Sequence, residues 1–292
     1  MSDFSPDWLA LREDLDRRSR APNLLRRLHG RFGSADRTAV CDLGAGSGAL
    51  LRALAPYLAE RQEWTLLDRS AENLDAARQA LTHWAGRAVE TDAGLALVRE
   101  GRRFQVCLRR CDLSTDLNAV SAEADLVAAT ALFDLAAPAW IAALVALLAG
   151  RRQTLYAALT YRGGLLAEPE HPLDGAVAAA FEVHQRSDKG LGGIAAGPEA
   201  QQLLSRMLRA AGAAVEEADS TRHVTRSEAA LLKRELEGHA GAAAETGLLP
   251  PSAVSAWLQT RLAGTRRLSI GHGDLLASWP KAAQVAAQVE AA

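Results

Sequence analysis

The chain has 292 residues, of which 49% are hydrophobic and 23% are charged, so it can bury a core and is neither disordered nor fibrous. Its 33 basic and 35 acidic residues give a formal net charge of −2, which argues against a general nucleic-acid binder. Three cysteines are too few for a disulfide framework or a four-ligand zinc site, and no metal constellation is visible in the sequence. We therefore expect a reduced, cytoplasmic protein.

The sequence also predicts no association with a membrane. Residues 1–20 are charged and lack the apolar core of a secretory signal. The longest uncharged apolar stretch is residues 135–149, which is shorter than the ~20 residues that span a bilayer. We expect it to form a buried helix with Pro138 in the first turn.

Strand-like and helix-like segments alternate along the chain, a pattern typical of α/β proteins with a parallel sheet. Ser70 is a good N-cap for one of the helices. Helices are predicted over residues 9–28 (as one or two), 49–59, 70–84, 198–211 and, broken near Pro250 and Pro251, 227–263. Strands are predicted over residues 38–43, 64–67, 104–108, 124–129, 153–160, 214–218 and 267–270.

The amino-acid composition of the chain changes after residue 160. Residues 161–197 are rich in Gly, Pro, His and charge, and they are too long for an ordinary connection. No internal repeat or low-complexity linker divides the chain. We predict an N-terminal helical segment over residues 1–36 and a single domain over 37–292, with insertions at about 161–197 and 221–266.

A glycine-rich turn carries the strongest functional signal. Residues 40–48 follow a predicted strand and lead into a helix, and their three glycines allow positive φ and let a ligand lie against bare backbone. Asp68 follows Gly48 by twenty residues, at the end of the second strand. A carboxylate at that distance suits a ribose hydroxyl, so the turn predicts a nucleoside site beyond the strand ends.

Two types of cofactor are compatible with this turn. Gly44, Gly46 and Ala49 also fit the dinucleotide pattern, which makes an NAD(P)-dependent oxidoreductase one alternative. Asp42, however, would repel a pyrophosphate, whereas it can accept hydrogen bonds from an ammonium group or from backbone amides. Asp112 follows the third strand, where a carboxylate can meet an adenine amino group.

Together these motifs resemble those of the class I S-adenosylmethionine-dependent methyltransferases. Residues 42–48 resemble the first motif of that family, 67–70 the second and 110–113 the third, and 128–134 lie where the fourth is found. The resemblance covers roughly residues 38–160. It implies a doubly wound, mostly parallel, seven-stranded Rossmann-like sheet with helical cap insertions. It also implies S-adenosyl-L-methionine as cofactor and S-adenosyl-L-homocysteine as product.

The resemblance assigns parts of the cofactor to individual residues. The glycine loop would lie against the methionine part, Asp68 would bind the ribose hydroxyls and Asp112 would meet adenine N6. Arg12 or Arg20 would pair with the methionine carboxylate. The full set of predicted cofactor-binding residues is Asp42, Gly44, Ala45, Gly46, Gly48, Asp68, Arg69, Asp112, Leu113, Thr130 and Arg20.

The same resemblance places the methyl acceptor above the carboxyl ends of the fourth and fifth strands. The predicted catalytic residues there are His184, Asp134 and His171, as a base or as substrate contacts. Residues 184–193 mix polar side chains of both charges with glycines, so they form either a substrate clamp that holds an anionic group or a solvated loop. His272 and Asp274, which we place after the last strand, either face the pocket or terminate the sheet.

We therefore expect a methyltransferase that acts on O or N of a small-molecule acceptor, possessing no metal and acting on neither nucleic acid nor membrane. Residues 130–133 lack the Asn/Asp-Pro-Pro-aromatic signature of enzymes that methylate nucleobase amines. Three alternatives stay open: the oxidoreductase, a non-catalytic cofactor-binding scaffold or sensor, and an RNA methyltransferase that uses the basic segment 12–31. The sequence predicts no particular oligomeric state.

Overall fold

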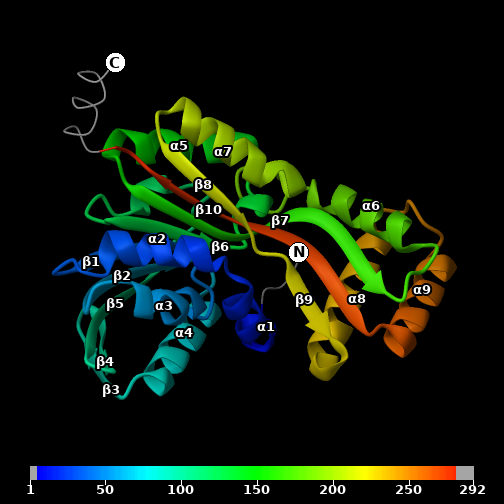
Figure 1. Cartoon of the computed structure of the whole chain (residues 1–292), viewed down its shortest axis with the longest axis horizontal. Coiled ribbons are helices and arrows are strands. Elements are labelled where there is room, and N and C mark those ends of the chain that lie inside the picture. The colour runs from blue at the N-terminus through cyan, green and yellow to red at the C-terminus, as the bar shows by residue number, and fades with distance from the viewer. Residues whose placement is uncertain (1–4, 281–292) are drawn as a thin grey trace.

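The computed structural model describes residues 5–280 (Figure 1). Within this range the strands form one ten-stranded sheet in the order β3-β4-β5-β2-β1-β6-β7-β10-β8, and β9 pairs with β10. The strands are β1 Thr38–Leu43, β2 Arg61–Asp68, β3 Arg87–Thr91, β4 Gly94–Arg99, β5 Arg102–Arg110, β6 Leu126–Thr130, β7 Thr154–Glu168, β8 Ala214–Asp219, β9 Arg222–Thr225 and β10 Arg267–Ser278.

The centre of the sheet is parallel. Strands β5, β2, β1, β6 and β7 pair in parallel, whereas β10 is antiparallel to both β7 and β8. The first strand, β1, lies in the middle of the sheet. The strands β2 and β5 lie on one side of it, and the chain then crosses over to β6 on the other side. In sheets of this kind, ligands bind in the crevice beyond the carboxyl ends of the strands at this switch point.

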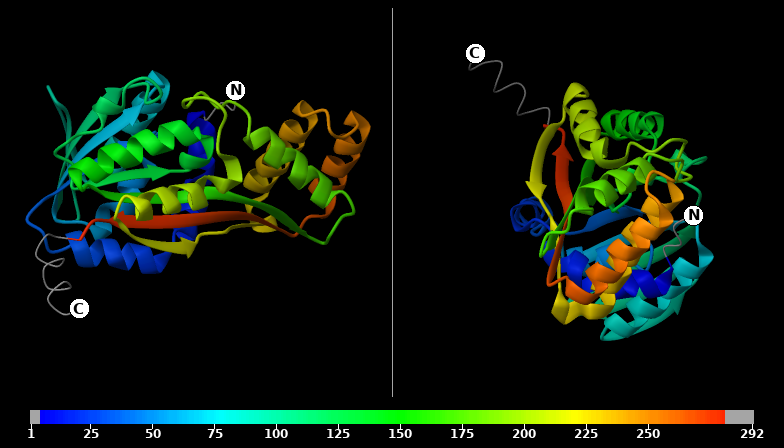
Figure 2. Two further views of the ribbon diagram at one scale, coloured as in Figure 1. Left: turned by 90° about the horizontal axis from the view of Figure 1, so that it is seen from above. Right: turned by 90° about the vertical axis from the view of Figure 1, so that its right-hand side faces the viewer.

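Helices cover both faces of the sheet (Figure 2). Alternate side chains of β1 point to opposite faces, so Val40 packs with the helices after β1 and β2, and Cys41 packs with those after β6. The α-helices are α1 Pro6–Ser19, α2 Pro22–Phe32, α3 Ala49–Leu54, α4 Ala71–Trp84, α5 Pro138–Arg151, α6 Asp174–Gln185, α7 Ala200–Ala210, α8 Ala229–Glu245 and α9 Pro251–Gly264. The predicted doubly wound, mostly parallel fold is thus confirmed.

Several local predictions are confirmed. The Ser70 hydroxyl accepts a hydrogen bond from Asn73 N at 3.2 Å and caps α4, and Pro138 is the first residue of α5. The sequence predicted a buried helix here, but α5 buries only one of its faces. The predicted helix over 49–59 is shorter, because α3 ends at Leu54 and a 3-10 turn contains Pro56, which lacks the N–H that would continue an α-helix. No helix of the described residues is long and apolar enough to cross a bilayer.

The sheet is larger than the predicted seven strands because the hairpin β3–β4 and the short strand β9 are added. Strands β7 and β10 are also far longer than expected, so part of the predicted loop 161–197 is strand. His272 and Asp274 consequently lie inside β10 and not after it. Glycine is required here: a Cβ on Gly271 would lie 2.3 Å from the Gly163 carbonyl oxygen, so the two strands meet through bare backbone.

A separate apolar cluster lies at the end of the sheet, and residues from both predicted insertions contribute to it. The extensions of β7 and β10, with β9, carry helices α6, α8 and α9, which gather beyond the parallel strands (Figure 1). Leu15 of α1 packs in the same cluster and is 1% exposed. This arrangement brings the N-terminal helix between the end of the sheet and the helices of the second insertion.

Candidate functional site

A small cleft of about 60 Å³ lies at the carboxyl ends of β1 and β6, where the fold predicts a ligand site. The loop between β1 and α3 forms its floor. Gly44, Gly46 and Gly48 have φ of 68°, 53° and 71°, which is the left-handed conformation that glycine adopts without strain. The predicted residues that line this cleft together are Arg20, Asp42, Gly44, Ala45, Gly46 and Thr130.

Two charged groups in this cleft keep polar atoms that have no partner within residues 5–280. Arg20 is 3% exposed, and it donates one hydrogen bond from Nη2 to Thr130 Oγ1 at 3.1 Å, whereas its Nε and Nη1 atoms are unpaired. Asp42 is 1% exposed and its Oδ2 atom is unpaired. Burial raises the pKa of Asp42 to about 8, and the nearby Arg20 opposes that rise. The cleft thus offers a cation and a carboxyl group side by side.

Helix α1 covers the cleft. A Cβ on Gly46 would lie 2.9 Å from Leu9 Cδ1, so the Leu9 side chain rests directly on the glycine loop. Glu13 of α1 accepts two hydrogen bonds from Arg52 of α3, one of them at 2.7 Å, and this holds the helix to the element that follows the loop. Any ligand larger than the cleft therefore requires α1 to shift.

The remaining predicted cofactor residues do not line this cleft. Asp68 accepts hydrogen bonds from Gly46 N and Ser70 N, each at 2.8 Å, so it organises the loop directly. Asp112 is exposed, and its Oδ1 atom accepts hydrogen bonds from the amide and hydroxyl of Ser114. The Leu113 carbonyl accepts a hydrogen bond from a tryptophan, and the Arg69 guanidinium lies beside Gly190.

A second and larger cavity, of about 430 Å³, adjoins the cleft and shares Arg12 with it. Residues from α1, from the segment after β6, from the middle of β7 and from α6, β9, α8 and β10 line this cavity. They are Trp8, Arg12, Ala131, Asp134, Leu135, Leu159, Tyr161, Phe181, His184, Gln185, Lys189, Arg222, Arg234, Glu235, Glu237, Gly238, His239, Ala242, Ile270 and His272.

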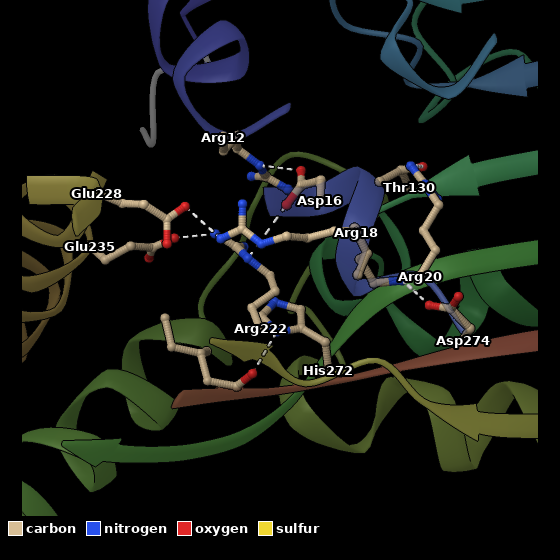
Figure 3. Close-up of polar contacts among 12 residues, drawn as sticks. Arg12, Asp16, Arg18, Arg20, Thr130, Arg222, Glu228, Glu235, His272 and Asp274 are labelled. Atoms are coloured by element: carbon tan, nitrogen blue, oxygen red, sulfur yellow. Dashed lines mark hydrogen bonds and ion pairs between the residues drawn. The ribbon is translucent and has the colours of Figure 1, made fainter. Parts of the chain in front are cut away.

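A network of buried ion pairs joins three elements around this cavity (Figure 3). Arg12 Nε donates to Asp16 Oδ2 at 2.6 Å within α1. Arg222 of β9 lies with its Nε atom 3.4 Å from Asp16 Oδ1, and it also forms an ion pair with Glu235 of α8. Because each of these charges has an opposite partner, the network fixes α1 against the second insertion.

Asp134 lies just beyond β6, where the cavity approaches the cleft. Its Oδ1 atom accepts a hydrogen bond from Tyr161 N at 3.4 Å. Burial raises the pKa of Asp134 to about 6, against the opposing effect of its hydrogen bonds and of Arg12. A carboxylate with this pKa can accept a proton near neutral pH.

The histidines around the cavity differ in their surroundings. Burial lowers the pKa of His272 to about 3, and it also lowers that of His239, so both rings are neutral. His184 lies between Glu245, at 3.0 Å, and Lys189, at 3.1 Å. The structure places His171 outside both cavities, at the start of α6, where its ring accepts a hydrogen bond from Leu173 N.

Sequence reasoning did not identify Glu235 and His239 as site residues, although a signal was present. The apolar residues Leu231, Leu232 and Leu236 repeat on one face of α8, and both polar residues fall on that same buried face. Polar side chains within an apolar helical stripe indicate a cavity or a buried partner. Arg222 carries no comparable signal, because its partners come from α1 and α8.

Asp274 anchors the chain next to Arg20. It is fully buried and accepts hydrogen bonds from Ala21 N, Tyr156 Oη and Leu159 N at 2.8–2.9 Å. Leu159 has a φ of 53°, which is strained for a leucine, and it lines the larger cavity. One carboxylate therefore fixes both the backbone beside Arg20 and a bend in β7.

Residues 5–280 contain no group of His, Cys, Asp and Glu side chains placed to hold a metal ion. No protein-family model matches the chain, and no curated protein matches it.

Solved structures are similar at low identity. The YcgJ protein of Bacillus subtilis has a TM-score of 0.49 and 10% identity, over 89% of this chain and 100% of that one. The cyclopropane synthase MmaA2 of Mycobacterium tuberculosis has a TM-score of 0.46 and 12% identity, over 87% and 83%. Phosphoethanolamine N-methyltransferase 2 of Haemonchus contortus, in complex with phosphomonomethylethanolamine and S-adenosylhomocysteine, has a TM-score of 0.46 and 14% identity, over 96% and 58%. Similarity this distant assigns no function to the chain.

Proposed function

We propose that the protein is an S-adenosylmethionine-dependent methyltransferase that acts on O or N of a small molecule. The observation that carries the proposal is the pair Arg20 and Asp42, whose buried polar atoms lack partners beside a bare glycine loop. Buried polar groups are almost always paired in folded proteins, so these atoms point to a ligand with its own charges. The amino-acid end of the cofactor carries one carboxylate and one ammonium group, which match the two side chains.

The residues present fit this cofactor better than a dinucleotide. A pyrophosphate carries negative charge only, so it would leave Asp42 without a cationic partner. In the proposed complex Arg20 binds the carboxylate, Asp42 accepts from the ammonium group, and Gly44 and Gly46 allow close approach. Asp68 and Asp112 remain our proposals for the ribose and the adenine. When bound, the cofactor supplies a methyl group on a positively charged sulfur.

The larger cavity is the proposed acceptor site, because it adjoins the cleft and shares Arg12 with it. The walls of this cavity would hold the acceptor near the cleft, and such positioning accounts for much of the catalysis when the leaving group is already activated. Asp134 accepts the proton that a hydroxyl or an ammonium acceptor loses. His184 and Lys189 are proposed to contact the acceptor near Asp134.

Titration calorimetry with S-adenosylhomocysteine tests the proposal directly. We expect saturable binding to the wild-type chain and no binding of NADH under the same conditions. Binding of NADH alone would establish the dinucleotide alternative, and absence of binding by millimolar S-adenosylhomocysteine would refute the methyltransferase. A thermal-shift titration provides a second readout, since a ligand at 100 times its Kd stabilises a protein by about 2.7 kcal/mol.

A further inference from the structure

Four rings form a continuous series along the larger cavity. His239 of α8 stacks on Phe181 of α6 with ring centroids 4.1 Å apart and an interplanar angle of 24°. Phe181 meets Tyr161 of β7 edge to face at 5.4 Å, and Tyr161 meets His272 of β10 in the same manner at 5.8 Å. These residues come from four different elements, so the series is held by the fold and not by one flexible loop. We call it the ring series.

Two polar atoms of the ring series have no partner within the described chain. Tyr161 Oη and His239 Nε2 are both buried and unpaired, in residues that are 4% and 3% exposed. The Nδ1 atom of His239 lies 2.7 Å from the Glu235 carbonyl oxygen, so Nδ1 carries the proton and Nε2 presents a lone pair. Burial lowers the pKa of His239, which keeps this tautomer uncharged at neutral pH.

These two atoms restrict the chemistry of a ligand. The lone pair on Nε2 requires a hydrogen-bond donor, whereas Tyr161 Oη both donates and accepts. A carboxylate has no proton to donate to Nε2, and the buried cations of the cavity, Arg12 and Arg222, already have acidic partners. Lys189 and Arg234 also line the cavity, but Lys189 is only half-buried and Arg234 is exposed. An ammonium group would leave the phenolic proton of Tyr161 without an acceptor. A hydroxyl group can donate to Nε2, and it can also donate to or accept from Tyr161 Oη, so it suits each of the two atoms.

We propose that the methyl acceptor is an uncharged aromatic compound with at least two hydroxyl groups. Its ring lies against the ring series, and a hydroxyl that is not methylated donates to His239 Nε2 and bonds to Tyr161 Oη. A second hydroxyl faces Asp134. The inference rests on the proposed function for the identity of the reaction, but the aromatic site itself does not depend on it. A cavity of about 430 Å³ has room for more than one ring.

Calorimetry with three matched probes tests the site on the full chain, with and without S-adenosylhomocysteine. The probes are 2,3-dihydroxynaphthalene, its dimethyl ether and 3-hydroxy-2-naphthoate. We expect the diphenol to bind at least tenfold more tightly than the ether, which has no donor, and than the naphthoate, which is charged. Equal affinities, tighter binding of the naphthoate, or no binding of any probe would overturn the inference.

Two substitutions test whether the preference for the diphenol comes from His239 and Tyr161. His239→Phe keeps a ring on Phe181 but removes Nε2, and Tyr161→Phe removes only Oη. Each is expected to weaken the diphenol at least fivefold and to leave the dimethyl ether unchanged, which a general loss of packing would not do. His83→Phe and Tyr57→Phe, outside the cavity, are the matched controls and are expected to bind like the wild type.

The two hypotheses fail separately. Binding of S-adenosylhomocysteine without preference for the diphenol would keep the methyltransferase and refute the hydroxylated aromatic acceptor. Binding of the diphenol by a chain that does not bind S-adenosylhomocysteine would keep the aromatic site and refute the methyltransferase.

Discussion

Two sets of buried charges beside the adjoining cavities differ in how they are compensated. Arg12 and Asp16, which line the cleft, pair with each other, and Arg222 joins Asp16 to Glu235, so that this set connects α1 to β9 and α8. In the cleft, Arg20 keeps two nitrogen atoms without partners. Buried charges are tolerated only when they are compensated, so the first set is compensated by the fold and the second requires a ligand. The paired charges build the site, and the unpaired ones are available to recognise what enters it.

The largest expected effect comes from breaking the paired charges, and it tests whether they stabilise the fold. Arg222→Ala leaves Asp16 and Glu235 as buried carboxylates without their shared cation, and breaking such a pair costs about 3–5 kcal/mol of stability. Urea unfolding measures the loss. Arg37→Ala, which breaks an exposed pair with Glu63, serves as the control and should cost no more than about 1 kcal/mol. Equal losses in the two variants would show that the buried network does not hold α1.

The second prediction tests whether the unpaired nitrogen atoms of Arg20 bind the ligand. Arg20→Ala should weaken S-adenosylhomocysteine by about 1.5–3 kcal/mol, the value of a hydrogen bond to a charged group, which is roughly 10- to 150-fold in Kd. The free protein should lose far less stability than with Arg222→Ala, because only one bond of Arg20, to Thr130, is broken. Calorimetry and urea unfolding of the same variant separate the two effects. Arg27→Ala, on the surface of α2, is the matched control; an unchanged Kd for Arg20→Ala would contradict the role in binding.

The conformation of the glycine loop was predictable because its residues follow one another along the chain. A strand, three glycines and a helix define the loop within residues 38–54, and local backbone requirements leave a clear pattern there. The N-cap at Ser70 and the proline at the start of α5, Pro138, are local signals in the same sense. Arg20 was one of two candidates, and only the structure distinguishes it, since Arg12 is paired with Asp16.

The larger cavity was not predictable in the same way. Its walls come from α1, β7, α6, α8 and β10, and no single stretch of sequence records that they meet. The extensions of β7 and β10 were hidden because Gly163, Gly164, Gly271 and Gly273 interrupt the strand pattern. Asp134 and His184 were placed at the cavity by the resemblance, whereas His171, chosen on the same grounds, lies apart from it.

A third prediction follows from the pKa of Asp42. Burial raises this pKa from 3.8 to about 8, so between these pH values the folded chain keeps a proton that the unfolded chain releases. Stability of the free protein should therefore fall as pH rises through this window, by up to about 1.4 kcal/mol per pH unit from this group. Asp42→Asn has no such proton, so its melting temperature should exceed that of the wild type increasingly from pH 5 to pH 8. Parallel curves would contradict the prediction, and the exposed Asp14→Asn should follow the wild type.

The smallest expected effect is on the rate at which a ligand enters the cleft beneath α1. The amino-acid end of the proposed cofactor would enter the cleft beneath α1, where the Leu9 side chain rests on the glycine loop, so we expect α1 to shift before the cofactor binds. Leu9→Ala removes the side chain that rests on Gly46, and Glu13→Gln removes the ion pair with Arg52. Each should lower the barrier to opening by about 0.5–1 kcal/mol, the range of a partly exposed contact, which is about two- to fivefold in association rate.

Stopped-flow fluorescence with S-adenosylhomocysteine measures this rate. Asp7→Asn, on the exposed side of α1, is the control and should not change it. Because Leu9 and Glu13 attach α1 to two different elements, the glycine loop and α3, the double variant should bind faster than either single one. Association rates equal to the wild type in all three variants would mean that the cleft admits its ligand without movement of α1, and the unpaired atoms of Arg20 and Asp42 would then have to be reached from the side of the larger cavity.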